Sequence, residues 1–275
     1  MGKSTFVNNL IGQKVAITSP KPQTTRFPIH ALYGEPRGKI IFVDTPGIFD
    51  RVKDALAKKI NLQTEHAIND AVDVVIYMVD HTRRRDFEEG KVLGIVRRIK
   101  KPKILVINKM DLQEKSFLPQ YEFLKDEFTK IYKISAINKT HLKPLMDEVF
   151  DLLPEVTVDS FPKDLVHPAF NIDSKIFLSE LIREKVFLKT GQEIPYTTTV
   201  VVDEVTERSD SHTYIKARIL TTRIQYKRML IGSKGQKIKE LGSMARKEIE
   251  LATGKKIFLD LTVEVDPHWQ ETIYQ

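Results

Sequence analysis

The sequence predicts an α/β fold in two parts: a domain with a mixed, mainly parallel sheet, followed by a smaller α+β domain. In the first half, runs rich in Val and Ile alternate with helical patterns, as in a parallel sheet covered on both faces. A stretch with three prolines, residues 154–168, interrupts this alternation. Beyond it the elements change to the order helix, strand, strand, helix, helix, strand.

The first domain, residues 1–154, opens with a helical pattern over residues 4–11 that Gly12 ends. Residues 28–44 hold two strand patterns joined by the turn residues Gly34–Gly38, which predicts a hairpin and one antiparallel edge strand. Buried strands are predicted at 39–47, 71–80, 101–111 and 131–136, and further helices at 53–69, 86–99, 119–130 and 141–152.

Residues 155–173 are predicted to connect the two domains. The second domain, residues 174–275, begins with an amphipathic helix at 174–189. Strands rich in β-branched residues are predicted at 196–205 and 213–222, and a last strand at 255–265. Two helices joined by a tight glycine-containing link lie between the second and the last of these strands.

The composition narrows the classes of function. The chain of 275 residues has no cysteine, which excludes disulfides and thiolate zinc sites and favours a reducing compartment. No apolar run is long enough to span a bilayer.

The net charge is +7, and residues 216–247 carry only one acidic side chain, Glu240. The basic side chains of that block are Lys216, Arg218, Arg223, Lys227, Arg228, Lys234, Lys237, Lys239, Arg246 and Lys247. Such a block favours nucleic acid as partner, the alternative being a solvated helical face.

Gly2, Lys3, Ser4 and Thr5 have the order found at the end of a phosphate-binding loop. There the glycine allows close backbone approach, the lysine meets the phosphates and the hydroxyl binds Mg²⁺. The following helix offers its N-terminal N–H groups to the same phosphates. Lys3 is the candidate catalytic residue, because its charge would stabilise the phosphate oxygens.

Asp44, Thr45, Pro46 and Gly47 follow a predicted strand, at the edge where α/β sheets place ligand groups. An aspartate at this position holds Mg²⁺ through water, and a glycine N–H meets the γ-phosphate. The alternative is an ordinary strand-ending turn.

A further short sequence motif (each such motif is called a box below) consists of Asn108, Lys109, Met110 and Asp111. The carboxylate of Asp111 accepts two parallel hydrogen bonds from guanine, a pair of donors that adenine lacks. The stem of Lys109 would lie along the base. Ser135 and Ala136, after the next strand, would close the base pocket with backbone groups.

The candidate switch segment, residues 20–30, contains Gln23, Thr24, Thr25 and Arg26. With GTP bound, one of the two threonines would reach Mg²⁺ and the γ-phosphate and so order the segment. The candidate Mg²⁺ ligands are therefore Ser4, Asp44 and either Thr24 or Thr25.

Together these boxes resemble those of P-loop GTPases, in the branch that includes the translation factors. The resemblance implies binding of GTP/GDP with Mg²⁺ and hydrolysis of GTP. Ile48, included in the candidate nucleotide site, stands where Ras-like GTPases have the glutamine that orients water. Intrinsic hydrolysis is therefore expected to be slow, unless backbone groups, a cation or a partner place the water. In such proteins a strand and the first half of the phosphate-binding loop come before the residues that match Gly2–Ser4. We therefore expect that this chain is N-terminally truncated and that its sheet lacks the first strand.

The link in the second domain resembles the GXXG loop of a type II KH domain, which clamps the backbone of about four single-stranded nucleotides. The candidate RNA-binding residues are Ile231, Gly232, Ser233, Lys234, Gly235, Lys237 and Lys239. The alternative is a glycine-rich helical hairpin without an RNA role.

A G domain followed by a type II KH domain is similar to the Era family over essentially the whole chain. "VDTPG", "IREK" at Ile182–Lys185, "IPY" at Ile194–Tyr196 and "IGSKGQKIKELG" carry this resemblance. It implies a slow GTPase that binds small-subunit, 16S-type rRNA near its 3′ end and acts in maturation of the 30S-type ribosomal subunit. It further implies a cytoplasmic monomer with peripheral contact to the inner face of the cell membrane.

Two other functions stay open. The first is an RNA-binding assembly factor with a G domain impaired by the incomplete phosphate loop, which a lack of GTP binding would favour. The second is an RNA-modification GTPase. Such a protein would carry a modification domain or a reactive C-terminal cysteine, whereas this chain has no cysteine.

Overall fold

The computed structural model describes residues 1–21, 24–26, 28–47, 60–61, 72–113, 116–156, 174–191, 193–209 and 211–272. Gln23, Ile48, most of the predicted helix at 53–69 and most of the predicted connector lie outside the described residues. The chain divides into two compact units. The first comprises Met1–Thr18 and Thr25–Phe170, and the second comprises Ser19–Thr24 and Asn171–Gln275.

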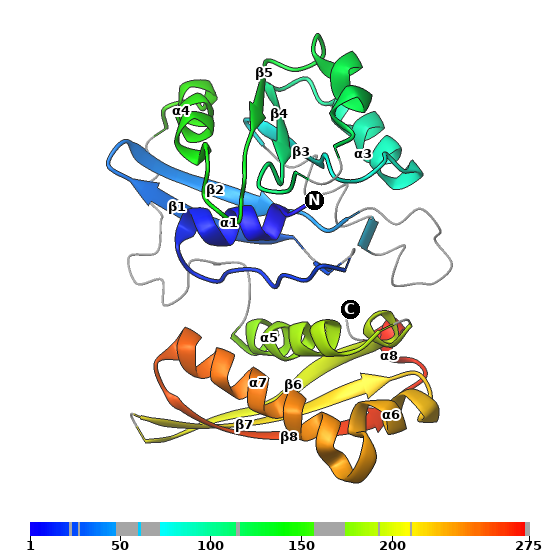
Figure 1. Ribbon diagram of the computed structural model, residues 1–275. Helices are drawn as coiled ribbons and strands as arrows, with labels where there is room; N and C mark the ends of the chain where they lie inside the picture. Colours follow the sequence, from blue (N-terminus) through cyan, green and yellow to red (C-terminus); the bar gives the residue numbers. More distant parts are fainter. Residues whose placement is uncertain are drawn as a thin grey trace. The chain divides into compact units, whose positions relative to one another are not determined.

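The first unit alternates helices and strands in the predicted order (Figure 1). Its described elements are α1 (Lys3–Ile11), β1 (Ile29–Glu35), β2 (Gly38–Asp44), β3 (Val75–Asp80), α3 (Phe87–Arg98), β4 (Lys103–Asn108), η1 (Leu118–Leu124), β5 (Lys130–Lys133) and α4 (Leu142–Leu152). The hairpin β1–β2 is antiparallel and runs in register from Ile29 opposite Asp44 to Glu35 opposite Gly38. Strands β3, β4 and β5 are parallel, in that order.

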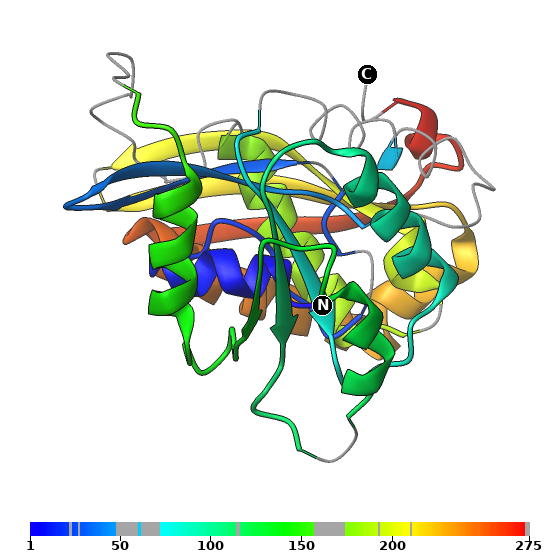
Figure 2. The ribbon, with the colours of Figure 1, turned by 90° about the horizontal axis from the view of Figure 1, so that it is seen from above.

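The strands of the first unit form two sheets that share no hydrogen-bond ladder. The sequence predicts a single mixed sheet, and its antiparallel and parallel parts are both present as separate pieces. Among the described residues no strand lies between β2 and β3 to pass hydrogen bonds from one piece to the other. Helix α1 packs on the hairpin, where the rings of Phe6 and Phe42 meet edge-on at 5.9 Å (Figure 2).

The parallel sheet is held by a core between its strands, α3 and η1. The buried side chains of this core are Tyr77, Val79, Leu93, Val96, Leu105, Ile107, Tyr121, Leu124 and Phe128. Helix α3 begins where predicted, because the Asp86 side chain accepts a hydrogen bond from the Glu89 N–H at 2.8 Å and caps the first turn. This core fixes the ends of β3 and β4, from which the candidate site is built.

The predicted α-helix at 119–130 is instead a 3₁₀ segment, η1, followed by turns. Its backbone bonds span three residues, from the N–H of Gln120 to the oxygen of Phe117 and from that of Lys125 to Glu122. The spacing of three residues places Tyr121 and Leu124 on one side, facing the core. An α-helix would also place these two side chains on one side, so their burial does not by itself account for the 3₁₀ form.

The second unit is a three-stranded sheet with helices. Its described elements are α5 (Ser174–Lys189), η2 (Ile194–Thr197), β6 (Thr198–Ser209), β7 (His212–Thr221), α6 (Ile224–Ile231), η3 (Ser233–Gly235), α7 (Gln236–Thr253), β8 (Lys256–Val265) and α8 (Trp269–Thr272). Strand β7 pairs antiparallel with β6 and parallel with β8. Helices α5 and α7 pack on each other, α5 on β6 and α7 on β8 (Figure 1).

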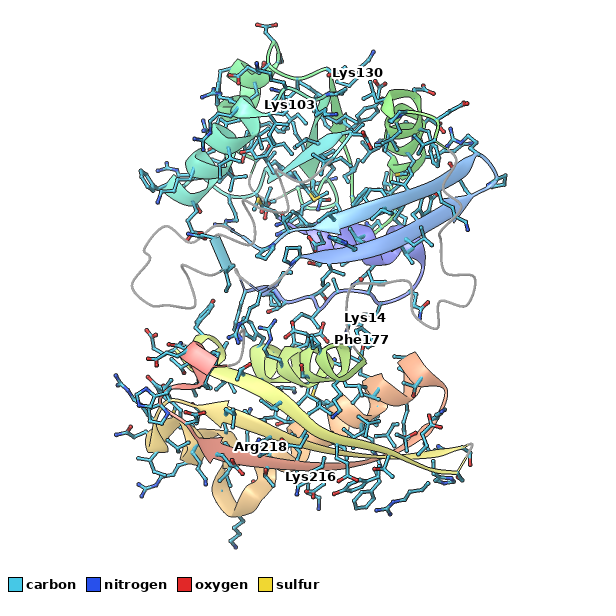
Figure 3. All side chains as sticks on the ribbon, turned by 180° about the vertical axis from the view of Figure 1, so that it is seen from behind. Lys14, Lys103, Lys130, Phe177, Lys216 and Arg218 are labelled. Atoms are coloured by element: carbon cyan, nitrogen blue, oxygen red, sulfur yellow. The ribbon has the colours of Figure 1, made fainter. Side chains whose placement is uncertain are left out.

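The two faces of this sheet differ in character. Along β7, Thr213, Ile215 and Ala217 are buried, whereas the alternating Lys216 is exposed and Arg218 is partly exposed. Figure 3 shows Lys216 and Arg218 on the side of the sheet that α7 does not cover. Arg218 is paired there with Asp203 at 2.8 Å and with Glu264 at 2.9 Å.

Residues Ser19–Thr24 belong to the second unit although they precede β1 in the chain. The ammonium of Lys21 donates to the carbonyl oxygens of Phe187 and Thr190 at the end of α5. The carbonyl of Thr24 accepts a hydrogen bond of 2.5 Å from Nη2 of the buried Arg183. This part of the predicted switch segment is thus anchored within the second unit.

Candidate functional site

The first part of the site joins the start of α1 to the end of β2. Ser4 Oγ donates a hydrogen bond of 2.6 Å to Asp44 Oδ2. Thr5 follows in the same helix, and Thr45, Pro46 and Gly47 continue directly from β2. Two predicted boxes, forty residues apart in the chain, are therefore brought together.

Asp44 is the most unusual side chain of this region. It is buried, and its second oxygen, Oδ1, has no hydrogen-bond partner. Burial raises the pKa of the Asp44 carboxyl above its ordinary value, and the charge of Lys3 and the Ser4 hydrogen bond offset this only in part. A buried carboxylate oxygen without a donor is unfavourable by itself and suits an additional cation.

The two switch threonines differ in their contacts. Thr25 Oγ1 lies 3.2 Å from Ser4 Oγ, next to the Asp44 carboxylate. Thr24 Oγ1 instead donates to the carbonyl of Lys21 at 2.9 Å, within its own segment. Thr24, Thr25 and the neighbouring Arg26 are all buried.

Asn108, at the end of β4, connects three segments. Its Nδ2 donates to the carbonyl of Met1 at 2.9 Å, and its Oδ1 accepts from the Ala136 N–H at 2.9 Å. Gly2 approaches it so closely that a Cβ there would lie 2.5 Å from Asn108 Nδ2, and the Gly2 backbone has a positive φ of 94°. Glycine is therefore required at this position. In α1, Asn9 Nδ2 donates to the Ala136 carbonyl at 2.7 Å, a contact for which the sequence gives no signal.

A hydrogen bond between side chains joins two of the segments that are predicted to form the base pocket. Ser135 Oγ donates to Asp111 Oδ1 at 2.5 Å and leaves the other carboxylate oxygen of the exposed Asp111 available. Met110 holds the loop after β4 in place. Its N–H donates to the carbonyl of Ile134 at 3.0 Å, and its side chain packs on the core of the parallel sheet. The box that follows β4 and the Ser135–Ala136 pair thus form one structure.

Lys109 has a partner that the motifs do not reveal. Its ammonium lies 2.6 Å from Oδ2 of Asp80, the residue that ends β3 and pairs in register with Asn108. Burial opposes ionisation of Asp80, yet hydrogen bonds from Lys109 and Thr82 outweigh it and lower the pKa of the Asp80 carboxyl. Asp80 ends a predicted strand on the ligand edge of the sheet, and that position was the only available signal.

The second candidate site is the loop between α6 and α7. Gly232 has φ 73° and ψ 176°, and a Cβ on it would lie 2.6 Å from Lys237 Cβ and 3.0 Å from the Lys237 backbone nitrogen. Ser233 and Lys234 are exposed at the tip, and Lys234 and Gly235 also have positive φ angles. Ile231 ends α6, whereas Lys237 and the exposed Lys239 lie in the first turn of α7. The loop presents backbone and cations to solvent in the manner that nucleic-acid phosphates require.

Two negative findings apply to the part of the chain that the structure describes. No cluster of three or more His, Cys, Asp or Glu side chains there is arranged to bind a metal. No helix within it combines the length and apolarity needed to cross a bilayer.

Comparison with known proteins matches both units. Residues 1–109 match the family described as 50S ribosome-binding GTPase, and residues 193–270 match the KH domain family. The chain is 38% identical to GTPase Era of Halothermothrix orenii, over 98% of this chain and 91% of that relative. It is 37% identical to GTPase Era of Carboxydothermus hydrogenoformans, over 98% of this chain and 90% of that relative.

Two solved structures resemble the whole chain. One is Era in complex with MgGDPNP and nucleotides 1506–1542 of 16S ribosomal RNA, with a TM-score of 0.89 and 32% identity over 98% of this chain and 91% of that one. The other is a substituted form of Aquifex aeolicus Era bound to GDP·AlF4⁻, with a TM-score of 0.89 and 33% identity over 98% of this chain and 92% of that one. These matches confirm the predicted fold class, a P-loop GTPase domain followed by a type II KH domain. On this shared sequence and structure, the chain belongs to the Era family of GTPases.

Proposed function

We propose that this protein binds GTP and GDP with Mg²⁺, hydrolyses GTP slowly, and binds small-subunit rRNA near its 3′ end during maturation of the 30S ribosomal subunit. The observation that carries the GTP part is the Ser4–Asp44 pair, with a buried carboxylate oxygen that has no donor. The RNA part is supported by the Gly232–Gly235 loop and by the relative solved with a 16S rRNA fragment.

The residues at the Ser4–Asp44 pair fit Mg²⁺, which prefers oxygen ligands and usually keeps several waters. Ser4 supplies a hydroxyl, and Asp44 supplies the buried anionic oxygen that otherwise lacks a partner. Thr25 is the better third candidate than Thr24, because its hydroxyl lies 3.2 Å from that of Ser4. When bound, Mg²⁺ would neutralise charge on the β- and γ-phosphates.

Specificity for guanine rests on Asp111 and its surroundings. One carboxylate oxygen of Asp111 is fixed by Ser135, which orients the carboxylate before any base arrives. Asn108 holds Ala136 next to it, so that backbone groups of the Ser135–Ala136 pair border the base. Adenine would leave this carboxylate without its donors, which disfavours adenine nucleotides strongly.

Hydrolysis requires that water attack the γ-phosphate while charge builds up on its oxygens. Lys3, in the first turn of α1, supplies a cation for that charge together with the N–H groups of the helix start. Ile48 has no hydrogen-bonding side chain with which to orient the water, and this supports a slow intrinsic rate.

Nucleotide binding is tested by titrating the protein with GDP, GTP and ATP in the presence of Mg²⁺, followed by measurement of phosphate release. We expect tight binding of GDP and GTP, no measurable binding of ATP, and slow release of phosphate from GTP. Ser4→Ala should weaken the Mg²⁺ dependence, while Asp126→Asn, an exposed site in the same unit, serves as the control. If the unaltered protein binds no guanine nucleotide, the function reduces to that of an RNA-binding assembly factor with an impaired G domain.

RNA binding is tested with a single-stranded oligonucleotide matching the 3′ end of 16S rRNA. We expect Lys234→Glu to weaken binding and to lower its salt dependence, because one cation near the phosphates is lost. Lys91→Glu, on α3 of the first unit, is the matched charge control. Equal affinity of the Lys234 variant and the unaltered protein would argue against an RNA role for the loop.

We propose that the bound nucleotide controls the affinity of the protein for RNA. This proposal is supported by the switch segment, in which Ser19–Thr24 are part of the second unit and Thr25 is part of the first. A rearrangement of Thr25 on GTP binding would therefore displace the preceding residues, Ser19–Thr24, which are hydrogen-bonded to α5 and to Thr190 after it. RNA affinity that is identical with a GTP analogue, with GDP and without nucleotide would rule the coupling out.

The cellular setting completes the proposal: a cytoplasmic monomer with peripheral contact to the inner face of the cell membrane. Light scattering coupled to gel filtration tests the oligomeric state. Sedimentation with vesicles containing anionic lipid tests membrane contact, with neutral vesicles as the control.

A further inference from the structure

The backbone of Lys109 adopts a conformation that few side chains tolerate. Its φ is 68°, in the left-handed region, and it is not a glycine. The conformation is held by two donors to the Lys109 carbonyl: the Leu112 N–H and His81 Nε2, both at 2.9 Å. The Lys109 loop is thus attached to the segment that follows β3.

The side chain of Lys109 is held by the same segment. Its ammonium lies 2.6 Å from Asp80 Oδ2, and Asp80 is almost fully buried. The other oxygen, Oδ1, accepts hydrogen bonds from the Thr82 N–H at 3.0 Å and from Thr82 Oγ1 at 2.7 Å. Oδ1 is therefore hydrogen-bonded and Oδ2 is ion-paired, so contacts within the protein orient the anion without any nucleotide.

Two further contacts connect these loops. The N–H of Phe117 donates to the His81 carbonyl at 2.7 Å, and His81 Nδ1 lies 3.3 Å from Ser116 Oγ. The segment after β3 therefore contacts the polypeptide on either side of Asp111. It acts as a fixed support for the box that is proposed to recognise guanine.

We propose that Asp80 is a positioning residue of the guanine-nucleotide site, which orders the Lys109 side chain along the position of the base before the nucleotide binds. This inference rests on the proposed function, since it assigns the support of a nucleotide-contacting side chain. A lysine loses much rotamer freedom when it is fixed, and a partner that fixes it beforehand removes this cost from binding.

The test compares the affinities of Asp80→Asn, Lys109→Met and the double variant for GDP and for inosine diphosphate. Inosine diphosphate lacks the 2-amino group that Asp111 would accept from, so the ratio of the two affinities reports on Asp111 alone. We expect Asp80→Asn to weaken both nucleotides by about tenfold and to leave their ratio unchanged. We expect the double variant to bind as weakly as Lys109→Met and no more weakly.

Asp126→Asn is the matched control, with the same change of charge at an exposed position of the same unit. A general loss of structure would instead lower the melting temperature of Asp80→Asn without nucleotide, and its effect on affinity would add to that of Lys109→Met. Lys109→Met is the variant that leaves a buried charge unpaired, because Asp80 is almost fully buried whereas the Lys109 side chain is partly exposed. If Lys109→Met fails to fold, the double variant, in which no buried charge is left unpaired, takes its place and should bind no more tightly than Asp80→Asn.

Three outcomes overturn the inference. In the first, Asp80→Asn binds GDP as tightly as the unaltered protein, and in the second the two substitutions have additive effects. In both cases the proposed function stands. In the third, the unaltered protein fails to bind GDP, and then the proposed function fails as well.

Discussion

Ser4 Oγ donates a hydrogen bond of 2.6 Å to Asp44 Oδ2, and this bond joins the first turn of α1 to the last residue of β2. The hydroxyl satisfies only one of the two carboxylate oxygens, although the whole Asp44 side chain is buried. A structure optimised for stability alone would not leave such an oxygen without a donor. On the proposed function, this oxygen is the one that would face Mg²⁺.

Asp44→Asn should separate stability from function. Burial raises the pKa of Asp44, which means that the fold disfavours its charged form. The neutral amide removes that cost, which we expect to exceed the smaller cost of its buried N–H donors. We expect the melting temperature of the nucleotide-free protein to rise by about 2–4 °C, equivalent to about 1 kcal/mol. The additional stabilisation that Mg²⁺ gives to the GDP-bound protein should disappear.

Thermal scans with GDP, in Mg²⁺ and in EDTA, measure both effects, and Asp126→Asn again controls for a change of net charge. An Asp44 variant that keeps the full Mg²⁺-dependent shift would show that this carboxylate does not contribute to the metal site.

Asp111→Asn should change which base is accepted. The amide presents one acceptor and one donor where the carboxylate presents two acceptors, so the 2-amino group of guanine loses its partner. We expect GDP affinity to fall by about a hundredfold or more, and xanthosine diphosphate, which has an oxygen at that position, to bind better than GDP. The Ser135 hydroxyl still donates to the amide oxygen, so the loop should keep its structure.

Competition between the two nucleotides for the variant measures this exchange, and Asn138→Asp, nearby but outside the motif, is the control. An unchanged preference for guanine would remove Asp111 from the recognition site.

The boxes of the candidate site were predictable because each follows a recognisable strand or begins a helix. Parallel strands place their carboxyl ends at one edge, so Asp80 and Asn108 lie side by side in the register. The sequence did not predict which side chains would pair across that edge. The Lys109–Asp80 contact spans β3 and β4, and the Asn9–Ala136 contact spans most of the first unit. Both depend on three-dimensional placement and not on a motif.

Local structure was less predictable where the hydrophobic pattern fits two kinds of helix. The helical pattern after Leu118 forms a 3₁₀ segment, and its buried Tyr121 and Leu124 have a spacing of three residues that suits an α-helix equally. The predicted single sheet occurs as two pieces, since a ladder needs a strand at every position and none of the described strands connects β2 to β3. The strands themselves, from β1 to β8, lie at or close to their predicted positions.

Gly232→Ala should disable the loop between α6 and α7. The backbone at φ 73° and ψ 176° is nearly restricted to glycine, and the new Cβ would meet the Lys237 backbone nitrogen at 3.0 Å. We expect RNA affinity to fall by about tenfold or more, with GDP binding unchanged, because the strain of about 1–3 kcal/mol is relieved by moving the loop.

Gly242→Ala in α7 is the matched control, since its Cβ makes only an ordinary contact of 3.9 Å with Leu261. This substitution should stabilise the helix and leave RNA binding intact. Equal RNA affinities of the two variants, measured by fluorescence anisotropy, would show that the geometry of the loop is not used for binding.

Glu89→Gln should stabilise the first unit in a way that depends on pH. Glu89 is buried beside Tyr121; burial raises its pKa above the ordinary 4.5, and the Tyr121 hydrogen bond and the charge of Arg85 offset this only in part. An acid with a raised pKa in the fold favours folding while it is protonated, and this contribution is lost as the pH rises through that pKa. The glutamine imitates the protonated form, so its advantage in melting temperature should be near zero at pH 4 and should increase towards pH 8.

Glu122→Gln, an exposed site on η1, is the control and should show no such trend. An advantage of Glu89→Gln that is largest at acid pH would mean that the pairing with Arg85, and not desolvation, dominates at this carboxyl.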